Sequence, residues 1–259
     1  LIMLDLLFAE LRCSWIQFCR YPVESISQII FASAIFYGLF VGAGYVAGSS
    51  FQLGDRLDSL VVGYMLWVLV NFVMANIAGG LQSEAQTGTL EQLFLSRYGA
   101  VQVFLMRGLA YLTLEVLKIV IILFIIILLT GSSLYFPPLL ILPFISVLLG
   151  AYGFAFIIGS ISLLLKRVQQ LIPLLLFPLL FLLTIPTETW TGTPKFLALL
   201  IPMTPGAGLL RSLMARGDSL DLITLAIAFI NGIVYFYIGI SFFKVAEKQA
   251  KKRGILSGY

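Results

Sequence analysis

Six long apolar segments are the feature of this sequence that most constrains its fold. A hydrocarbon core of about 30 Å is crossed by about 20 helical residues that rise about 1.5 Å each. Of the 259 residues, 60% are hydrophobic and only 11% are charged, which is too apolar for a single aqueous core. We therefore expect an all-α integral membrane protein with six transmembrane helices. The expected spans are 23–47, 57–81, 108–130, 139–165, 171–186 and 222–243.

The fifth expected span differs from the others. It is short and contains Pro173 and Pro178. Each proline removes a backbone hydrogen-bond donor and favours a kink, so we expect this span to be bent.

The basic residues predict the orientation, because cytoplasmic loops retain lysine and arginine. An even number of spans places both termini on one side of the membrane. That side would hold eleven basic residues and the opposite side four, which predicts a plasma or inner membrane protein with both termini in the cytosol. The eleven are Arg12, Arg20, Arg97, Arg107, Lys166, Arg167, Lys244, Lys248, Lys251, Lys252 and Arg253, and the four are Arg56, Lys195, Arg211 and Arg216.

Residues 1–21 have the pattern of an amphipathic helix on the inner membrane face. An apolar stripe falls on one side at helical spacing, while acidic and basic residues lie off it. A cytosolic extension of the first span is the alternative, although Pro22 favours a break. Asp5, Glu10 and Arg12 argue against a cleavable signal. The stripe consists of Leu4, Leu7, Phe8, Leu11, Trp15 and Phe18.

The absence of histidine weakens most enzyme hypotheses. Histidine is the usual general base near neutral pH and the commonest zinc ligand, and this sequence has none. Cys13 and Cys19 are six residues apart, which matches no metal or redox motif. We expect no metal or cofactor site in this chain.

Residues 84–97, after the second span, predict a short cytosolic helix. Thr89 followed by Gln92 has the capping-box spacing, so the helix should start at Thr89. Leu90, Leu93 and Phe94 then share one face. This apolar face could dock into a groove of a partner protein or dip into lipid headgroups.

Residues 187–221, before the last span, contain two apolar pieces that are each too short to cross a bilayer. Pro202, Pro205 and two glycines interrupt them. This pattern predicts helices that enter the outer leaflet and turn back, with a plain extracellular loop as the alternative.

Four polar residues form a stripe on the third span: Arg107, Tyr111, Glu115 and Lys118. Unpaired charges cost several kcal/mol in the bilayer, so this stripe should not face lipid. The stripe could line an inner vestibule, or Glu115 and Lys118 could simply pair between helices. Elsewhere, Asn231 is expected to hydrogen-bond between helices, and small residues on the fourth span should form a packing seam. The basic residues of 244–259 should bind anionic headgroups.

The stretch Glu84-Ala85-Gln86-Thr87-Gly88-Thr89-Leu90-Glu91-Gln92-Leu93 resembles the loop after the second span of type-2 ATP-binding-cassette exporter permeases. The resemblance implies a coupling helix that docks on a separate ATPase. The residues that match the motif are Glu84, Gly88, Thr89, Leu90, Glu91 and Leu93, and the resemblance implies that Leu90, Leu93 and Phe94 seat in the ATPase. Pro205 looks like the family's proline before its last outer helix, whereas Ser96-Arg97-Tyr98 lacks a proline that many members have.

The resemblance also implies the partners. Two permease chains, expected to be a homodimer, would assemble with two ATPase subunits that bind ATP and Mg²⁺. The sequence contains no G-x-x-x-x-G-K-[ST] phosphate-binding loop, so we expect the motor to be another polypeptide. Membrane lipids are expected partners and nucleic acid is not. The expected substrate is an amphiphilic drug-like molecule or a lipid.

Three other functions stay open at this stage. An exporter of a lipid-linked glycan fits the same apolar spans. An ion-coupled secondary transporter could use Glu115, but it predicts an internal repeat that the two halves do not show. An intramembrane enzyme would need a nucleophile and a base, for which the sequence offers no paired carboxylates and no histidine.

Overall fold

Helices make up all the regular structure of the computed structural model, which describes residues 2–47, 54–96, 99–164 and 171–253. Within these described residues, five helices are long and apolar enough to cross a membrane. They are α2 (Pro22–Ala47), α3 (Gly54–Met74) continued by η2 (Ala75–Gly79) and α4 (Gly80–Thr87), α6 (Ala100–Thr130), α7 (Ile141–Leu164) preceded by η3 (Pro138–Leu140), and α11 (Leu222–Arg253). The predicted all-α membrane fold is confirmed.

The fifth predicted span is shorter than expected. Helix α8 (Leu171–Thr184) has 14 residues and continues through Pro178. At about 1.5 Å per residue it is too short to cross the hydrocarbon core as a helix alone. A sixth span is reached only if the next bent helix pair, α9 and α10, counts as one.

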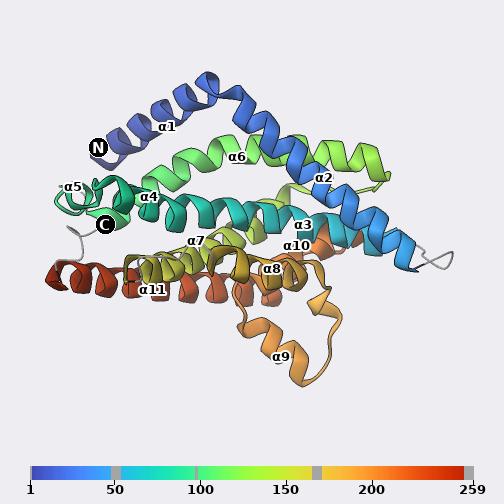
Figure 1. Cartoon of the computed structure of the whole chain (residues 1–259). Helices are drawn as coiled ribbons and strands as arrows, with labels where there is room; N and C mark the ends of the chain where they lie inside the picture. Colours follow the sequence, from blue (N-terminus) through green and yellow to red (C-terminus); the bar gives the residue numbers. More distant parts are fainter. Residues whose placement is uncertain (1, 48–53, 97–98, 165–170, 254–259) are drawn as a thin grey trace.

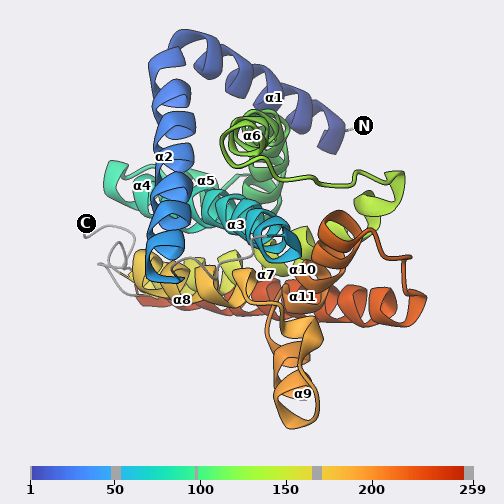
Figure 2. The same cartoon turned by 90° about the vertical axis from the view of Figure 1, so that its right-hand side faces the viewer.

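Helices α3 and α7 form the centre of the bundle. In the most apolar stretches of these two spans 61% and 56% of the residues are buried, against 11% for α2, 17% for α6 and 22% for α11. Figure 2 shows α3 between α6 on one side and α7 with α11 on the other, with α2 along a third side. The outward faces of α2, α6 and α11 are therefore left for lipid or for another chain.

Glycines let α7 and α11 pack backbone to backbone. A Cβ on Gly153 or Gly239 would overlap the main chain of the facing helix, and Phe156 packs edge-on against Phe243 at 5.4 Å between ring centroids. The predicted small-residue seam of α7 lies on another face, where Gly159 contacts Leu81 at the end of the second span. Both faces of α7 thus carry a close helix contact.

The segment before α11 folds into two helices that meet at 108°. These are α9 (Thr193–Leu200) and α10 (Thr204–Arg211), which continues as η5 (Ser212–Arg216). Every residue of α10 is buried, whereas α9 projects from the bundle with Phe196, Leu197 and Leu200 exposed. Two interrupted apolar pieces were predicted here, and the structure has them.

Asn231 of α11 satisfies the main chain at this bend. Its side-chain amide donates to Leu199 O at 2.9 Å and to Ile201 O at 3.2 Å, and its oxygen accepts from Met203 N at 3.3 Å. Tyr235, one turn later, donates to Leu200 O at 2.7 Å. A helix break in an apolar environment needs such partners, and the predicted interhelical role of Asn231 is confirmed.

Candidate functional site

The segment that resembles the family's loop, residues 84–93, is called the motif segment here. It lies at one end of the bundle, beside the start of α1 (Ile2–Arg20) and the end of α11 (Figure 1). Helix α4 stops at Gly88, whose φ of 73° suits a residue without a side chain. Gly88 N donates to Ala85 O and Thr89 N donates to Glu84 O, which closes the last turn. Helix α5 (Leu90–Phe94) follows directly, so a short helix starting at Thr89 was predicted correctly.

Glu84 connects this segment to two other helices. The Thr89 hydroxyl donates to the Glu84 carboxylate, and Arg107 Nη1 of α6 donates to Glu84 Oε1 at 2.8 Å. Arg107 Nε also lies 3.5 Å from Glu10 Oε1 of α1. The predicted capping box is wrong in this detail, because the described hydrogen bonds of the Thr89 side chain go to Glu84 and Thr87 and none joins it to Gln92.

The apolar face of α5 that was predicted to dock on a partner is not exposed in this structure. Leu90, Leu93 and Phe94 are only 4%, 9% and 6% exposed and belong to the main buried cluster of this chain, together with Phe104 of α6. The spacing identified the apolar face of α5, but that face packs inward. Leu95, directly after α5, is the large apolar side chain that points outward at this end, and it is 83% exposed. The side chain of Glu91, and all of Arg97, lie outside the described residues.

The end of α11 supports α5 from the other side. Lys251 Nζ lies 5.3 Å from the centroid of the Phe94 ring and 3.5 Å from Phe94 O. Of the predicted basic tail, Lys244, Lys248 and Lys252 are exposed on the same helix, and residues 254–259 lie outside the described part. Helices α6 and α11 therefore contact the motif segment directly, and α1 is joined to it through Arg107.

The polar stripe of α6 faces α1 and α2, as its charge requires. Tyr111 donates to the Gln17 side chain of α1. Lys118 forms an ion pair with Glu115 and donates to Gln28 Oε1 of α2 at 2.7 Å. The predicted pairing of Glu115 with Lys118 is present in the structure.

Helix α1 turns its polar side toward α6. Ser14 is buried and Glu10 contacts Arg107, while Phe8, Trp15 and Ile16 are more than half exposed. A helix with its aromatic side chains turned outward suits a membrane interface. The helix is also interrupted at Tyr21, between α1 and α2, as Pro22 predicted.

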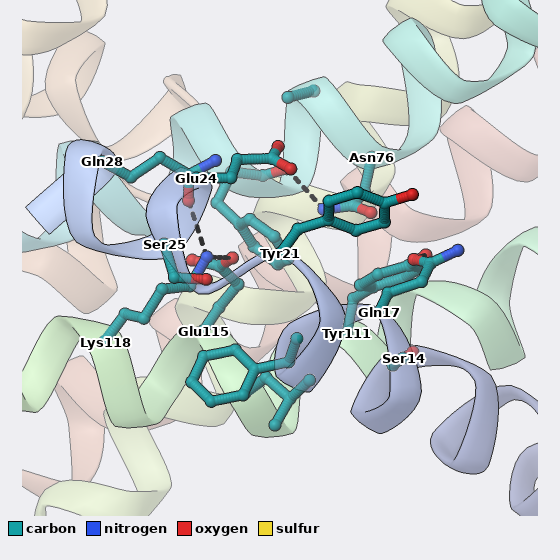
Figure 3. Close-up of a pocket in the computed structure, with 14 residues that line it drawn as sticks. Ser14, Gln17, Tyr21, Glu24, Ser25, Gln28, Asn76, Tyr111, Glu115 and Lys118 are labelled. Carbon is teal, nitrogen blue, oxygen red and sulfur yellow. Dashed lines mark hydrogen bonds and ion pairs between the residues drawn. The ribbon is translucent and has the colours of Figure 1, made fainter.

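A cavity of about 470 Å³ opens between α1, α2, α6 and the junction of α3 with η2. Figure 3 shows Tyr111, Glu115 and Lys118 on one wall, with Glu24 and Gln28 of α2 opposite. The η2 turn is a π-helix that places Ala75 and Asn76 at the cavity. Such turns often occur at functional sites. The stripe therefore both pairs internally and lines a cavity.

A second charged cluster, at the opposite end, was missed. Arg211 of α10 is fully buried, pairs with Glu188 of η4 (Thr187–Thr189) at 2.7 Å and donates to Leu183 O. Arg216 reaches the other Glu188 oxygen at 3.2 Å. The signal available was that Glu188 is the first acid after the fifth span, in a region that also contains Arg211 and Arg216. Among the described residues, no group of three Cys, Asp or Glu side chains could hold a metal ion.

The model of the ABC-2 type transporter family matches residues 6–215, from α1 to η5. The chain belongs to the ABC-2 type transporter family. It is thus a multi-pass membrane permease component of an ABC transporter, a class that generally works with an ATPase subunit. No curated protein matches this permease.

Proposed function

We propose that this permease is the membrane subunit of an ATP-driven exporter, and that a separate ATPase docks on its α5 end. Two permease chains and two ATPases would form the complex, with ATP and Mg²⁺ bound by the ATPases and both permease termini in the cytosol. The substrate is an amphiphile, either drug-like or a lipid, that crosses between the two permease chains.

The observation that carries this proposal is the way α5 is held. A docking helix must transmit force, so it should be fixed to the spans and still present a free surface. Leu90, Leu93 and Phe94 fix it, while Gln86, Gln92 and Leu95 remain exposed. We therefore assign docking to the rim formed by Gln86, Gln92 and Leu95.

The contacts of Glu84 suggest how a movement of the ATPase subunits is transmitted to the membrane helices. A displacement of α5 moves Glu84, and through Arg107 it moves α6 and α1. Nucleotide would then bias two arrangements of the spans, inward-facing and outward-open.

The exposed faces of α2, α6 and α11 are an argument for the proposed second permease chain. In the most apolar stretches of these spans only 11%, 17% and 22% of the residues are buried within one chain, so a symmetric partner has apolar surface available. The homodimer is the simplest such assembly.

Copurification tests this proposal. Tagged wild-type protein extracted from native membranes should bring an ATPase with it, and Leu95→Asp should lose that ATPase without a change in thermal unfolding, because Leu95 is exposed. Tyr135→Asp is the matched control, since Tyr135 is 60% exposed and follows the far end of α6, where its N donates to Met214 O of η5. A wild-type protein that transports its substrate alone, or transport driven by a proton gradient rather than ATP, would reject the proposal.

A further inference from the structure

The cavity between α1, α2, η2 and α6 has more negative than positive charge. Two carboxylates, Glu24 and Glu115, face it together with one ammonium, Lys118. Lys118 is already paired with Glu115. The Glu24 carboxylate has no hydrogen bond or ion pair within the described part of the chain, so it is available for a cation.

The chain's own lysine shows that this cavity can hold an ammonium group. Lys118 Nζ lies 2.7 Å from Gln28 Oε1 and 6.0 Å from the centroid of the Phe72 ring. Aromatic faces attract cations, most strongly where water is excluded. Three further rings line the same cavity, those of Phe18, Tyr21 and Tyr111.

Asn76 adds one further acceptor to the cavity. Asn76 donates its amide to Phe72 O, which leaves its carbonyl oxygen as an acceptor for a ligand, and Tyr111 donates to Gln17. An anionic headgroup would meet Glu24 and find Lys118 already neutralised. The volume of about 470 Å³ lies within the range of about 300–1,000 Å³ typical of sites for drug-sized molecules.

We propose that this cavity binds the cationic head of an amphiphile, a substituted ammonium or a similar organic cation, between Glu24 and the rings of Phe18, Tyr21 and Tyr111. The exposed aromatic side of α1, with Phe8 and Trp15, would receive the apolar part. The inference rests on the proposed export function only in naming the substrate class, because binding itself needs no motor.

Binding of radiolabelled tetraphenylphosphonium to the purified full chain in lipid nanodiscs tests this directly. Glu24→Gln should weaken binding about tenfold or more, the equivalent of about 1.4 kcal/mol. Glu247→Gln is the matched control, because it removes the same charge from α11, outside the cavity, and should leave affinity unchanged. Thermal unfolding confirms that both variants fold.

A second pair of variants tests the cavity without changing charge. Ser25→Trp should fill the cavity and abolish binding, whereas Ser27→Trp, at an exposed position on the same helix outside the cavity, should bind as the wild type does. Benzyltrimethylammonium should displace the probe and methyl glucoside should not.

Three outcomes would overturn the inference: wild-type affinity in Glu24→Gln, equal losses in Glu24→Gln and Glu247→Gln, or displacement by the sugar alone. The last would favour a glycan headgroup. Failure here is separable from failure of the export proposal, because copurification of the ATPase does not depend on Glu24.

Discussion

Arg107 of α6 donates to Glu84 at 2.8 Å and joins the motif segment to the third long span. Their side chains are 27% and 20% exposed, and Glu10 of α1 shares the same guanidinium. One arginine therefore holds two carboxylates that belong to two different helices. This makes Arg107 the point through which movement of α5 should reach the membrane.

Arg107→Met should leave both carboxylates unpaired and lower stability by about 1–3 kcal/mol, measured by thermal unfolding in detergent. Because the α5 surface is unchanged, the ATPase should still bind while transport per ATP falls. Arg20→Met is the control, since Arg20 is exposed and contacts only the Tyr21 ring in the described structure. Unchanged transport per ATP would remove Arg107 from the coupling path.

Glu115→Ala alone should lower the stability of the protein more than Glu115→Ala combined with Lys118→Met. The single change strands a buried ammonium at a cost of about 3–5 kcal/mol, whereas the double change removes both charges. Denaturation in detergent of the two variants gives the comparison. If the single variant is as stable as the double, the ion pair does not stabilise this site.

Asn231→Leu should destabilise the bend between α9 and α10. It leaves Leu199 O, Ile201 O and Met203 N without partners, and an unsatisfied buried group costs about 1–3 kcal/mol. Tyr235→Phe removes a single bond and should cost less. A smaller loss in Asn231→Leu than in Tyr235→Phe, measured by unfolding in detergent, would contradict this account of the bend.

Gly153→Ala should force α7 and α11 apart, at a cost of about 1–3 kcal/mol, because its Cβ would overlap the main chain of Tyr235. Gly38→Ala in α2 is the matched control. Nothing lies within 4 Å of a Cβ there, and alanine is favoured over glycine in a helix by about 1 kcal/mol. Equal melting temperatures for the two variants would show that the backbone contact is not needed.

Local features of the sequence predicted much of this structure. Pro22 marked the break between α1 and α2, Thr89 marked the start of α5, and the charge spacing of the third span identified the Glu115–Lys118 pair. In each case the signal lies within one helix or at its end, where spacing and backbone preference decide.

The sequence did not show which residues are buried by segments that are distant along the chain. The spacing of Leu90, Leu93 and Phe94 shows that one face of α5 is apolar, but not that other helices of the same chain cover it. Arg211 was counted as an outer surface charge, yet it is fully buried because Glu188 and Leu183 O, more than 20 residues earlier, supply its partners.

Photocrosslinking from position 95 in native membranes tests the central claim most directly. With p-benzoylphenylalanine in place of Leu95, the account predicts a crosslink to a polypeptide that carries an ATP-binding phosphate loop, and with the same group at Tyr135 it predicts none. A crosslink to the ATPase from position 135 but not from position 95 would contradict both the docking surface and the orientation of the chain.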